Sequence, residues 1–347
     1  MPKTVIYAPN IHVGGGLVLL KGLIEVWPVD IEFKAHLDIR VKDLLELPHL
    51  SKVIWVKNNI FDRFKSDYFL AKAVGVKDTV LIFHGTPPIF KFHAKLISFM
   101  QNRILIEDIR HLKYSKRTSL RLIYERFLFR LLRSRVDEFI VQSDTFKSLL
   151  SIWCEKNRTF RSANPVINVM PFMKPIDLSI LNFRDNLEWD FIYVADGLAH
   201  KNHEQLLHAW LELAKLDLYP SLALTLGNDE SELLSKIDRL TVKGLKIFNI
   251  GQLSHHEIQQ SYLRSSALIY PSTIESFGLP LVEANELNIP ILASELDYVY
   301  EVCRPTETFD PNSSKSISRA VMKFLNVKID TQKIKTPSEF LSYIIGR

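Results

Sequence analysis

Short apolar runs alternate with helical patterns along the whole chain, and this alternation restricts the fold more than any other feature. In the first half, TVIYA is followed by a glycine turn and the helical pattern LVLLKGLIEVW, and the strand-like runs IEFKAHL, KVIWV, DTVLIF and KLISFM come next. The second half starts the same order again with DFIYV. Strands that alternate with helices pair in parallel and leave helices on both faces of the sheet. The sequence therefore predicts an α/β protein built from doubly wound parallel sheets.

The length of the chain indicates two domains. At 347 residues it exceeds what one hydrophobic core usually supports. The stretch 174–188 has no clear periodicity, carries Pro175 and is typical of a linker. We therefore predict a first Rossmann-like domain at 1–173, a linker at 174–188 and a second Rossmann-like domain at 189–347.

Composition excludes several classes of protein. The two cysteines, Cys154 and Cys303, form no C-x-x-C pair, which argues against a disulfide scaffold and against a cysteine-ligated metal site. We found no apolar run that approaches the roughly 20 residues needed to span a bilayer, and Pro9 and Asn10 interrupt the amino-terminal run, unlike a signal peptide. We therefore expect a cytoplasmic protein.

The stretch PSTIESFGLPLVEA, residues 271–284, places two carboxylates on either side of a tight turn and a helix start. It follows ALIYP, a strand-like run, so the turn lies at a strand's carboxyl end, where open α/β sheets bind ligands. Pro280 suits the first turn of the following helix. The amides just before it have no partner within the helix, and with the helix dipole they form a site for an anion such as phosphate. These amides belong to Phe277, Gly278 and Leu279.

Glu275 and Glu283 flank this anion site. Both side chains are negative, so they cannot bind the phosphate themselves and should instead accept hydrogen bonds from hydroxyl groups beside it. Sugar hydroxyls meet that requirement on both sides. The residues therefore predict a site for a phosphate that carries a sugar at each end.

The spacing of Glu275 and Glu283 within ESFGLPLVE resembles the E-x7-E motif of the family-4 retaining glycosyltransferases, the glycosyl transferases group 1. The resemblance extends through YPS before the motif and through PILASELDYVYEV and FDP after it, and covers roughly the second half of the chain. It implies the GT-B architecture, in which two Rossmann-like domains face a cleft. It also implies that Glu275 contacts the donor sugar, that Glu283 binds the ribose, and that the amides from Ser276 to Leu279 hold the diphosphate.

Lys201 stands at the start of a predicted helix, where a compact ammonium suits a diphosphate. The resembling family has a lysine in this KN context, preceded by an arginine at the strand end. Here Asp196 and Gly197 stand where that arginine is expected. We expect His200, or Arg103 from the opposite domain, to supply the missing positive charge.

Three consecutive glycines, Gly14, Gly15 and Gly16, follow the first predicted strand and allow the backbone to approach a ligand closely. Leu19 occupies the position of the third glycine of the dinucleotide fingerprint, which weakens an assignment to NAD binding. A flexible turn without a ligand is the other alternative. The resemblance implies a glycine-rich loop that lies across the cleft from the donor diphosphate.

Two predicted strands of the first half end in polar clusters, HGTP and QNR. Polar residues at the carboxyl ends of strands are well placed to meet a ligand. Our candidates for the acceptor side are therefore His84, Gln101, Asn102 and Arg103. For His84, a histidine that only satisfies its own hydrogen bonds is an equally good interpretation.

The segment 113–135 carries eight lysine and arginine residues against one glutamate. Its apolar residues recur at helical spacing while arginines occupy another face: Leu120, Ile123, Phe127 and Leu131 against Arg126, Arg130 and Arg133. A solvated basic face is the default interpretation. The sharper hypothesis is peripheral contact with anionic lipid at the inner face of the cytoplasmic membrane. Few aromatic residues interleave with these charges, so we expect no nucleic-acid partner.

Together these observations predict a retaining glycosyltransferase that moves a sugar from a nucleotide-diphosphate sugar to a carbohydrate hydroxyl on a lipid-linked acceptor, in bacterial-type surface polysaccharide assembly. Glu275 and Lys201 are the predicted catalytic residues. We expect no metal and no other cofactor, because amides and Lys201 can carry the charge that a metal would otherwise supply. Three alternatives remain: a nucleotide-sugar epimerase of the same fold, an NAD-dependent oxidoreductase, and a non-catalytic carbohydrate-binding or scaffold protein.

Overall fold

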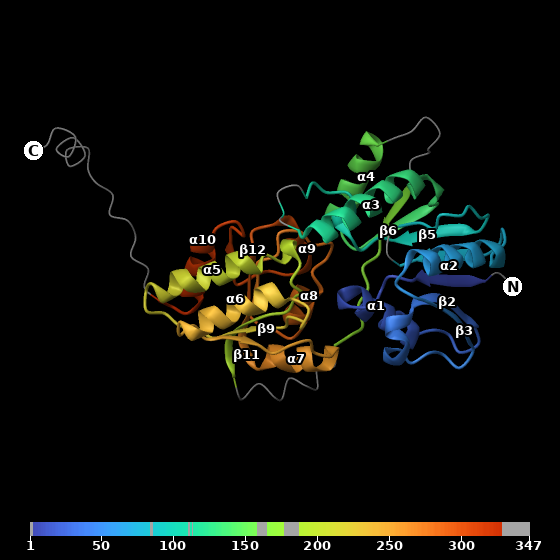
Figure 1. Ribbon diagram of the computed structural model, residues 1–347. Helices are drawn as coiled ribbons and strands as arrows, with labels where there is room; N and C mark the ends of the chain where they lie inside the picture. The colour runs from blue at the N-terminus through green and yellow to red at the C-terminus, as the bar shows by residue number, and fades with distance from the viewer. Residues whose placement is uncertain are drawn as a thin grey trace, which may run out of the picture.

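The computed structural model describes residues 3–83, 86–109, 112, 114–157, 165–176 and 187–327 as two α/β domains that lie side by side (Figure 1). Each domain is built on one parallel sheet, seven-stranded in the first and six-stranded in the second as far as the described residues go. The predicted fold class is therefore confirmed. The predicted linker, 174–188, falls between the two sheets, but 177–186 lie outside the described residues, so its boundaries stay a prediction.

The first sheet has the strand order β3-β2-β1-β4-β5-β6-β7. Its strands are β1 Thr4–Ala8, β2 Phe33–Asp38, β3 Ser51–Val56, β4 Thr79–Ile82, β5 Lys95–Phe99, β6 Glu138–Val141 and β7 Val166–Val169. The order changes direction at β1, which pairs with β2 on one side and β4 on the other. The glycine turn follows β1 directly, so the sequence places it at the switch point of this sheet, where open α/β sheets bind ligands.

In the described part of the first domain, four helices cover the two faces of the sheet: α1 Gly14–Glu25, α2 Ile60–Ala73, α3 Lys116–Leu132 and α4 Asp144–Lys156. Right-handed crossovers place a helix on one face when the chain moves along the sheet in one direction and on the other face when it moves back. In agreement, Leu20 of α1 packs into one core cluster. Leu70 of α2, Phe129 of α3 and Phe146 of α4 pack into another. Helices α2, α3 and α4 therefore share one face.

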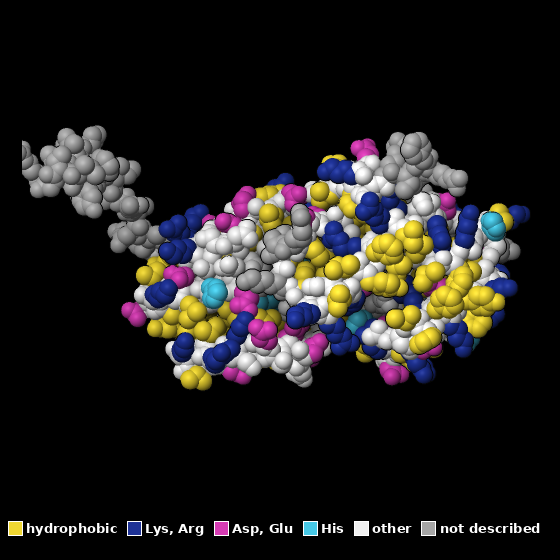
Figure 2. Space-filling view, turned by 45° about the horizontal axis from the view of Figure 1, so that its top comes forward, with side chains coloured by type: hydrophobic (Ala, Val, Ile, Leu, Met, Phe, Trp, Pro, Cys, Tyr) yellow, Lys and Arg dark blue, Asp and Glu magenta, His cyan; other side chains and the backbone are white. Residues whose placement is uncertain are grey.

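Helix α3 buries a different side from the one that its sequence pattern predicts. Leu122 and Phe129 are buried, and Arg126 and Arg133 lie on the same stripe at helical spacing. Arg126 donates to the carbonyl oxygens of Ile104 and Glu107, and Arg133 donates to Asn157 and lies over the ring of Trp153. The apolar row, Leu120, Ile123, Phe127 and Leu131, is exposed instead (Figure 2). The predicted basic outer face is therefore wrong for Arg126 and Arg133.

The second sheet has the strand order β10-β9-β8-β11-β12-β13. Its strands are β8 Trp189–Tyr193, β9 Leu222–Leu224, β10 Ile247–Asn249, β11 Ser265–Tyr270, β12 Ile291–Ser294 and β13 Glu307–Phe309. Its helices are α5 His203–Ala214, α6 Ser231–Val242, α7 His255–Leu263, α8 Leu279–Glu286, α9 Asp297–Val302 and α10 Ser314–Phe324. The order changes direction between β8 and β11, which are neighbours. The loops after these two strands therefore meet at the second switch point.

Side-chain caps fix several helix starts. Ser143 accepts a hydrogen bond from the amide of Phe146 at the start of α4, and Ser254 and Glu257 form a capping box at α7. Each cap satisfies amides that the first helical turn leaves free. Among the described residues, no helix combines the length and the apolarity that crossing a bilayer requires.

Trp210 of α5 is the largest fully buried side chain in the hydrophobic core of the second domain. Its ring stands edge-on to Phe191 with centroids 5.7 Å apart, and its indole N–H donates to the carbonyl of Pro220 at 2.8 Å. Replacing a buried tryptophan by alanine removes apolar area, leaves a cavity and here also orphans a carbonyl.

We expect Trp210→Ala to lower the free energy of unfolding by about 3 to 5 kcal/mol. Urea unfolding followed by circular dichroism measures this change. Leu216→Ala, at a position 57% exposed just past the same helix, is the matched control and should change it by less than about 0.5 kcal/mol. Equal losses in the two variants would contradict the packing described here.

Candidate active site

The loops after β8 and β11 are joined by hydrogen bonds at the second switch point. The side-chain amide of Asn202 donates to the carbonyl of Pro271 at 3.1 Å, and the backbone N–H of Thr273 donates to the carbonyl of His200 at 2.8 Å. Asn202 adopts a left-handed conformation, with φ of 63°, between a 3₁₀ turn at Ala199–Lys201 and α5. The two loops are therefore held as one unit.

Lys201 and Glu275 form an ion pair across these loops, with 2.6 Å between Nζ and Oε1. The hydroxyl of Tyr270, the last residue of β11, donates to the same oxygen at 2.8 Å. Burial alone would raise the pKa of Glu275, but the Lys201 ammonium outweighs it and the pKa is lowered. Burial likewise opposes the charge of Lys201, and Glu275 with Asp196 overcomes it, so its pKa is raised. Both groups are charged at neutral pH.

The turn after Glu275 leads directly into α8. Gly278 precedes the helix with φ of 76°, a left-handed conformation that glycine adopts without strain. The first bond of the helix joins the amide of Leu281 to the carbonyl of Gly278 at 2.9 Å. The amides of Phe277, Gly278 and Leu279 therefore precede the hydrogen-bonded turns, as the sequence predicts. This helix start lies in the same turn as the Lys201–Glu275 pair.

Glu283 lies inside α8 and is 4% exposed. The hydroxyl of Tyr262 donates to its Oε2 at 3.0 Å, and Nδ1 of His255 lies 3.5 Å from its Oε1. Burial raises the pKa of Glu283 to about 7, and the hydrogen bond from Tyr262 only partly opposes that rise. Glu283 is thus a buried acceptor whose charge depends on pH in the neutral range.

The glycine turn of the first domain touches this helix start. A Cβ on Gly15 would lie 2.9 Å from Cδ1 of Leu279, and Leu279 belongs to the same core cluster as residues of β1 and α1. A Cβ on Gly16 would lie 3.1 Å from Oε1 of Gln101. Gly14 opens α1 with φ of 66°. Of the three glycines, Gly15 therefore lies against the predicted donor side, while Gly16 lies against the acceptor-side residue Gln101 and Gly14 contacts neither side in the described part of the chain.

The predicted acceptor-side cluster also contacts the 275–279 turn. Ser276 donates to the carbonyl of Gln101, and Arg103 Nη1 donates to the carbonyl of Glu275 at 2.8 Å. Asn102 caps a 3₁₀ turn by accepting from the amide of Ile104 at 3.0 Å. These three residues therefore connect the two domains or fix a local turn. The fourth predicted residue, His84, lies outside the described residues.

Neither residue expected to replace the missing arginine brings a free positive charge to the site. Burial lowers the pKa of His200 to about 4, so its ring is neutral at pH 7, and its Nδ1 lies 3.0 Å from the hydroxyl of Tyr114. Arg103 is buried and forms an ion pair with Glu107. At the arginine position itself, the amide of Gly197 donates to Glu230 Oε1 at 3.1 Å. Lys201 and Arg103 therefore both bring positive charge to the 275–279 turn, and each is paired with a carboxylate, Lys201 with Glu275 and Arg103 with Glu107.

Several site residues were missed at the sequence level. Tyr270 had a weak signal, since it is a polar residue at the end of a buried strand next to the motif. Tyr262, His255 and Tyr114 had none, because each reaches its partner from a helix or loop distant in sequence.

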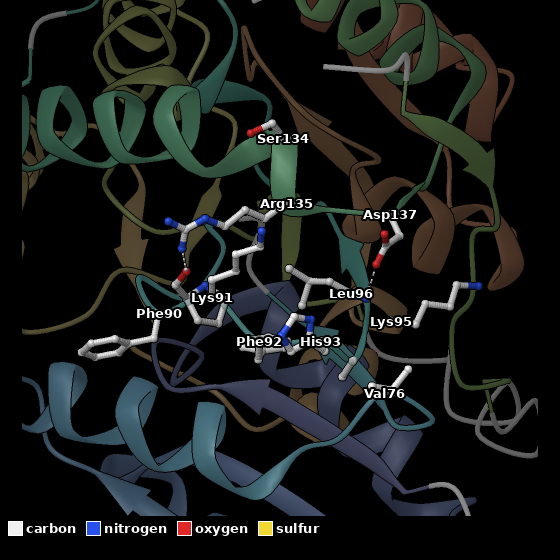
Figure 3. A pocket seen from close by; sticks show the side chains of 12 residues that line it. Val76, Phe90, Lys91, Phe92, His93, Lys95, Leu96, Ser134, Arg135 and Asp137 are labelled. Carbon is white, nitrogen blue, oxygen red and sulfur yellow. Dashed lines mark hydrogen bonds between the residues drawn. The ribbon is translucent and has the colours of Figure 1, made fainter. Parts of the chain in front are cut away.

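A cavity of about 790 Å³ lies elsewhere, at the amino ends of β4, β5 and β6 in the first domain (Figure 3). Its lining includes Val76, Lys91, Leu96 and Arg135. Ligands of open α/β sheets bind at the carboxyl ends of the strands, which is the opposite edge. The Lys201–Glu275 pair, at the carboxyl ends of the strands, is therefore the better candidate for an active site than this cavity.

Two parallel sheets whose switch-point loops contact each other are the arrangement of GT-B glycosyltransferases, and solved structures agree. Anabaena Alr3699/HepE in complex with UDP-glucose has a TM-score of 0.67 at 16% identity, covering 94% of this chain and 90% of that chain. Sucrose-phosphate synthase from Thermosynechococcus elongatus has a TM-score of 0.66 at 13% identity, with the same coverage. At these identities the likeness establishes the fold alone, and it confirms the predicted GT-B architecture.

Residues 182–338 match the family described as glycosyl transferases group 1. This match lies in the second half of the chain and confirms the resemblance drawn from the E-x7-E motif.

Two curated relatives are mannosyltransferases. The O-antigen chain mannosyltransferase RfbU of Salmonella typhimurium is 25% identical over 263 residues, 73% of this chain and 68% of that protein. The serotype-specific mannosyltransferase WbdA of Escherichia coli is 26% identical over 210 residues, 56% of this chain and 26% of that protein. The chain thus spans about a quarter of WbdA.

The raised pKa of Glu283 makes a prediction about stability. A carboxyl whose pKa is higher in the folded than in the unfolded protein holds its proton more tightly when folded, so its ionisation destabilises the fold. Stability from this group is present below its ordinary pKa of 4.5 and is lost as the pH rises through about 7.

We expect Glu283→Gln, which mimics the protonated form, to be more stable than the wild type by on the order of 3 kcal/mol near pH 8 and equal to it near pH 4.5. Urea unfolding at a series of pH values measures the difference. Glu232→Gln, at an exposed position of α6, should show no such pH dependence. Burial also raises the pKa of Asp67 to about 7. Asp67 is present in all three proteins, so its effect on stability cancels when they are compared. A pH-independent difference would contradict a buried, titrating Glu283.

Proposed function

We propose that this glycosyltransferase retains the anomeric configuration of a nucleotide-diphosphate sugar while it transfers the sugar to a carbohydrate hydroxyl. The observation that carries the proposal is the Lys201–Glu275 ion pair, which lies in the same turn as the start of α8. One group can bind a diphosphate and the other a sugar hydroxyl, and both are held at the switch point of the second sheet.

In the proposed donor complex, the diphosphate lies against the amides of Phe277, Gly278 and Leu279. The helix dipole and the Lys201 ammonium favour its negative charge. Lys201 then shares its hydrogen bonds between the diphosphate and Glu275, which frees acceptor capacity on Glu275 for a hydroxyl of the donor sugar. Glu283 accepts hydrogen bonds from the ribose hydroxyls.

The proposed reaction occurs on one face of the sugar. The bond between the anomeric carbon and the diphosphate oxygen breaks, and a bond from the acceptor oxygen to the same carbon forms. The acceptor proton passes to the leaving phosphate, so no protein base is needed. Lys201 and the amides stabilise the charge that builds on the diphosphate as it leaves.

The relatives' names suggest the sugar and the kind of acceptor. RfbU and WbdA are named mannosyltransferases, and RfbU is named for the O-antigen chain. We therefore propose mannose as the transferred sugar and a growing polysaccharide chain, carried on a membrane lipid at the cytoplasmic face, as the acceptor. We further propose that the acceptor approaches from the first domain, past the strand ends that carry Gln101, Asn102 and Arg103.

One observation favours a second candidate, a non-catalytic carbohydrate-binding protein of the same fold. Asp196 and Gly197 stand where an arginine is expected, and Glu230 accepts a hydrogen bond from the amide of Gly197. A carboxylate there weakens the positive field available to a leaving diphosphate. The two candidates differ in whether sugar is transferred at all.

Donor binding is the first test. We expect one member of a panel containing GDP-mannose, UDP-glucose, GDP and UDP to stabilise the protein by about 2.7 kcal/mol at a hundredfold excess over its dissociation constant. Thermal unfolding measures the shift. Glu283→Ala should abolish it, and Glu286→Ala, exposed on the same helix, should leave it intact. A folded protein that responds to none of these nucleotides would contradict the donor site proposed here.

Product stereochemistry is the second test. With an α-linked donor and a soluble oligosaccharide acceptor, proton NMR should show an α-linked product. Glu275→Gln should lower kcat by about a hundredfold or more, because it removes the charge that orients Lys201 and the donor, whereas Glu295→Gln, at an exposed position, should not. A β-linked product would overturn retention. An altered sugar nucleotide without acceptor would favour an epimerase, and no turnover with intact nucleotide binding would favour the non-catalytic candidate.

A further inference from the structure

Helix α3 exposes an apolar row along its outer side. Leu120, Ile123, Phe127 and Leu131 are 69%, 64%, 62% and 61% exposed. This row is not needed to pack α3 onto the domain. The inner side of the helix already does so through Leu122, Phe129 and the two arginines that have partners, Arg126 and Arg133. Over eleven residues of helix the row extends about 16 Å.

Helix α2 adds aromatic side chains on the same face of the sheet. Phe61, Phe64, Tyr68 and Phe69 are 87%, 51%, 45% and 44% exposed. Arg63 of α2 forms an ion pair within its own helix, with Asp67 at 3.6 Å, and burial lowers its pKa while the Glu125 carboxylate of α3 partly opposes that change. Figure 2 shows hydrophobic side chains gathered over this part of the first domain. We call the exposed residues of α2 and α3 the α2–α3 surface. Large exposed apolar surfaces mark sites of interaction with protein or membrane.

The exposed charges on the α2–α3 surface all have one sign, while Asp62 and Glu125 of the same helices are half-buried and Glu125 lies 3.8 Å from Arg121. Both helices are described in full, and every charged side chain exposed on them is basic: Lys65, Lys72, Lys116, Arg117, Arg121 and Arg130. Two of these cations lie over exposed rings, Lys65 over Phe69 at 5.8 Å and Lys72 over Tyr68 at 5.6 Å. Aromatic and aliphatic side chains surrounded by lysine and arginine are typical of surfaces that lie in the interface of an anionic bilayer. Protein interfaces, in contrast, are depleted in lysine.

The basic border continues past the end of α3. Phe90 packs edge-on against Phe64 of α2, with centroids 4.7 Å apart, and also lines the cavity shown in Figure 3. Lys91 and Arg135 line the same cavity, together with Asp137. The α2–α3 surface is therefore bounded by cations on this side as well.

The position of α3 connects this surface to the active site. Tyr114, two residues before the helix, lies 3.0 Å from His200, the neighbour of Lys201. Leu122 packs with Ile104 and with Ile274, the neighbour of Glu275. The exposed row of α3 thus begins beside the loops that hold the Lys201–Glu275 pair.

We propose that the α2–α3 surface docks on an anionic lipid bilayer, with the apolar row of α3 and the aromatic side chains of α2 at the level of the acyl chains and the cations at the headgroups. This inference rests on the proposed function, because it makes the bilayer that carries the acceptor the partner of the first domain. It places the membrane at the apolar row and not at Arg126 and Arg133. A sugar chain on a lipid carrier then reaches the cleft along α3.

Vesicle flotation of the full chain tests the proposal, with vesicles of phosphatidylcholine alone and vesicles that also contain phosphatidylglycerol. The wild type should float with the anionic vesicles, and raised salt should weaken this binding. The triple variant Leu120→Ser, Ile123→Ser, Phe127→Ser should lose it. The control is Leu216→Ser, Val242→Ser, Phe248→Ser, which removes three exposed apolar side chains from the second domain and should bind as the wild type does.

Charge is tested in the same assay. Replacing Arg117, Arg121 and Arg130 by glutamine should weaken binding by roughly fivefold per side chain, or about a hundredfold in all. The control replaces three exposed cations of the second domain by glutamine and should have little effect: Arg239, Lys243 and Lys246.

Three results would overturn the proposal: a wild type that stays off the anionic vesicles, an apolar variant that floats as well as the wild type, or light scattering that shows a wild-type dimer which the apolar variant splits. The last would assign the surface to a second copy of the chain. The nucleotide-induced thermal shift, measured on every variant, shows that each is folded. Membrane binding without any nucleotide shift would contradict the proposed function alone, and a shift without membrane binding would contradict this inference alone.

Discussion

The ion pair between Lys201 and Glu275, whose side chains are only 15% and 11% exposed, is the constraint on which the site depends. Burying two charges is costly unless each is paired and hydrogen-bonded, and here the loops after β8 and β11 are arranged to do this. Tyr270 donates to Glu275, and the hydroxyl of Tyr193 donates to the carbonyl of Lys201 at 2.7 Å. Asn202 joins the two loops. The neutral contacts are therefore as necessary to the site as the two charges are.

Much of the fold and part of the site could be read from the sequence, because they depend on local patterns. Strand periodicity, the caps at Ser143 and Ser254, and the turn into α8 are all decided within a few residues. The orientation of α3 was not predictable in this way. Its apolar row has regular spacing, but the opposite side of the helix carries two arginines with partners in the fold. Arg126 donates to the carbonyl of Ile104, and Arg133 lies over the ring of Trp153. Those partners are distant in sequence, so periodicity alone selects the wrong face.

The departure from the family pattern at Gly197 also shows the limit of a motif. The sequence showed that an arginine was missing but could not show which side chain contacts that position in the fold. Glu230 comes from the loop before α6, and burial raises its pKa, with further increases from Asp229 and Asp196. The electrostatic potential here is therefore more negative than the motif implies. Lys201 and the amides before α8 have to offset this negative charge.

The contacts between Leu279 and the glycine turn, and between Ser276 and Gln101, have a consequence for the rate of donor capture. They occupy the same turn whose amides we assign to the diphosphate, so a nucleotide enters only when the domains move apart. The observed affinity is then the intrinsic affinity scaled by the fraction of molecules that are open. A substitution at Leu279 that weakens this contact between the domains would change the association rate of the nucleotide without altering any group that contacts the sugar.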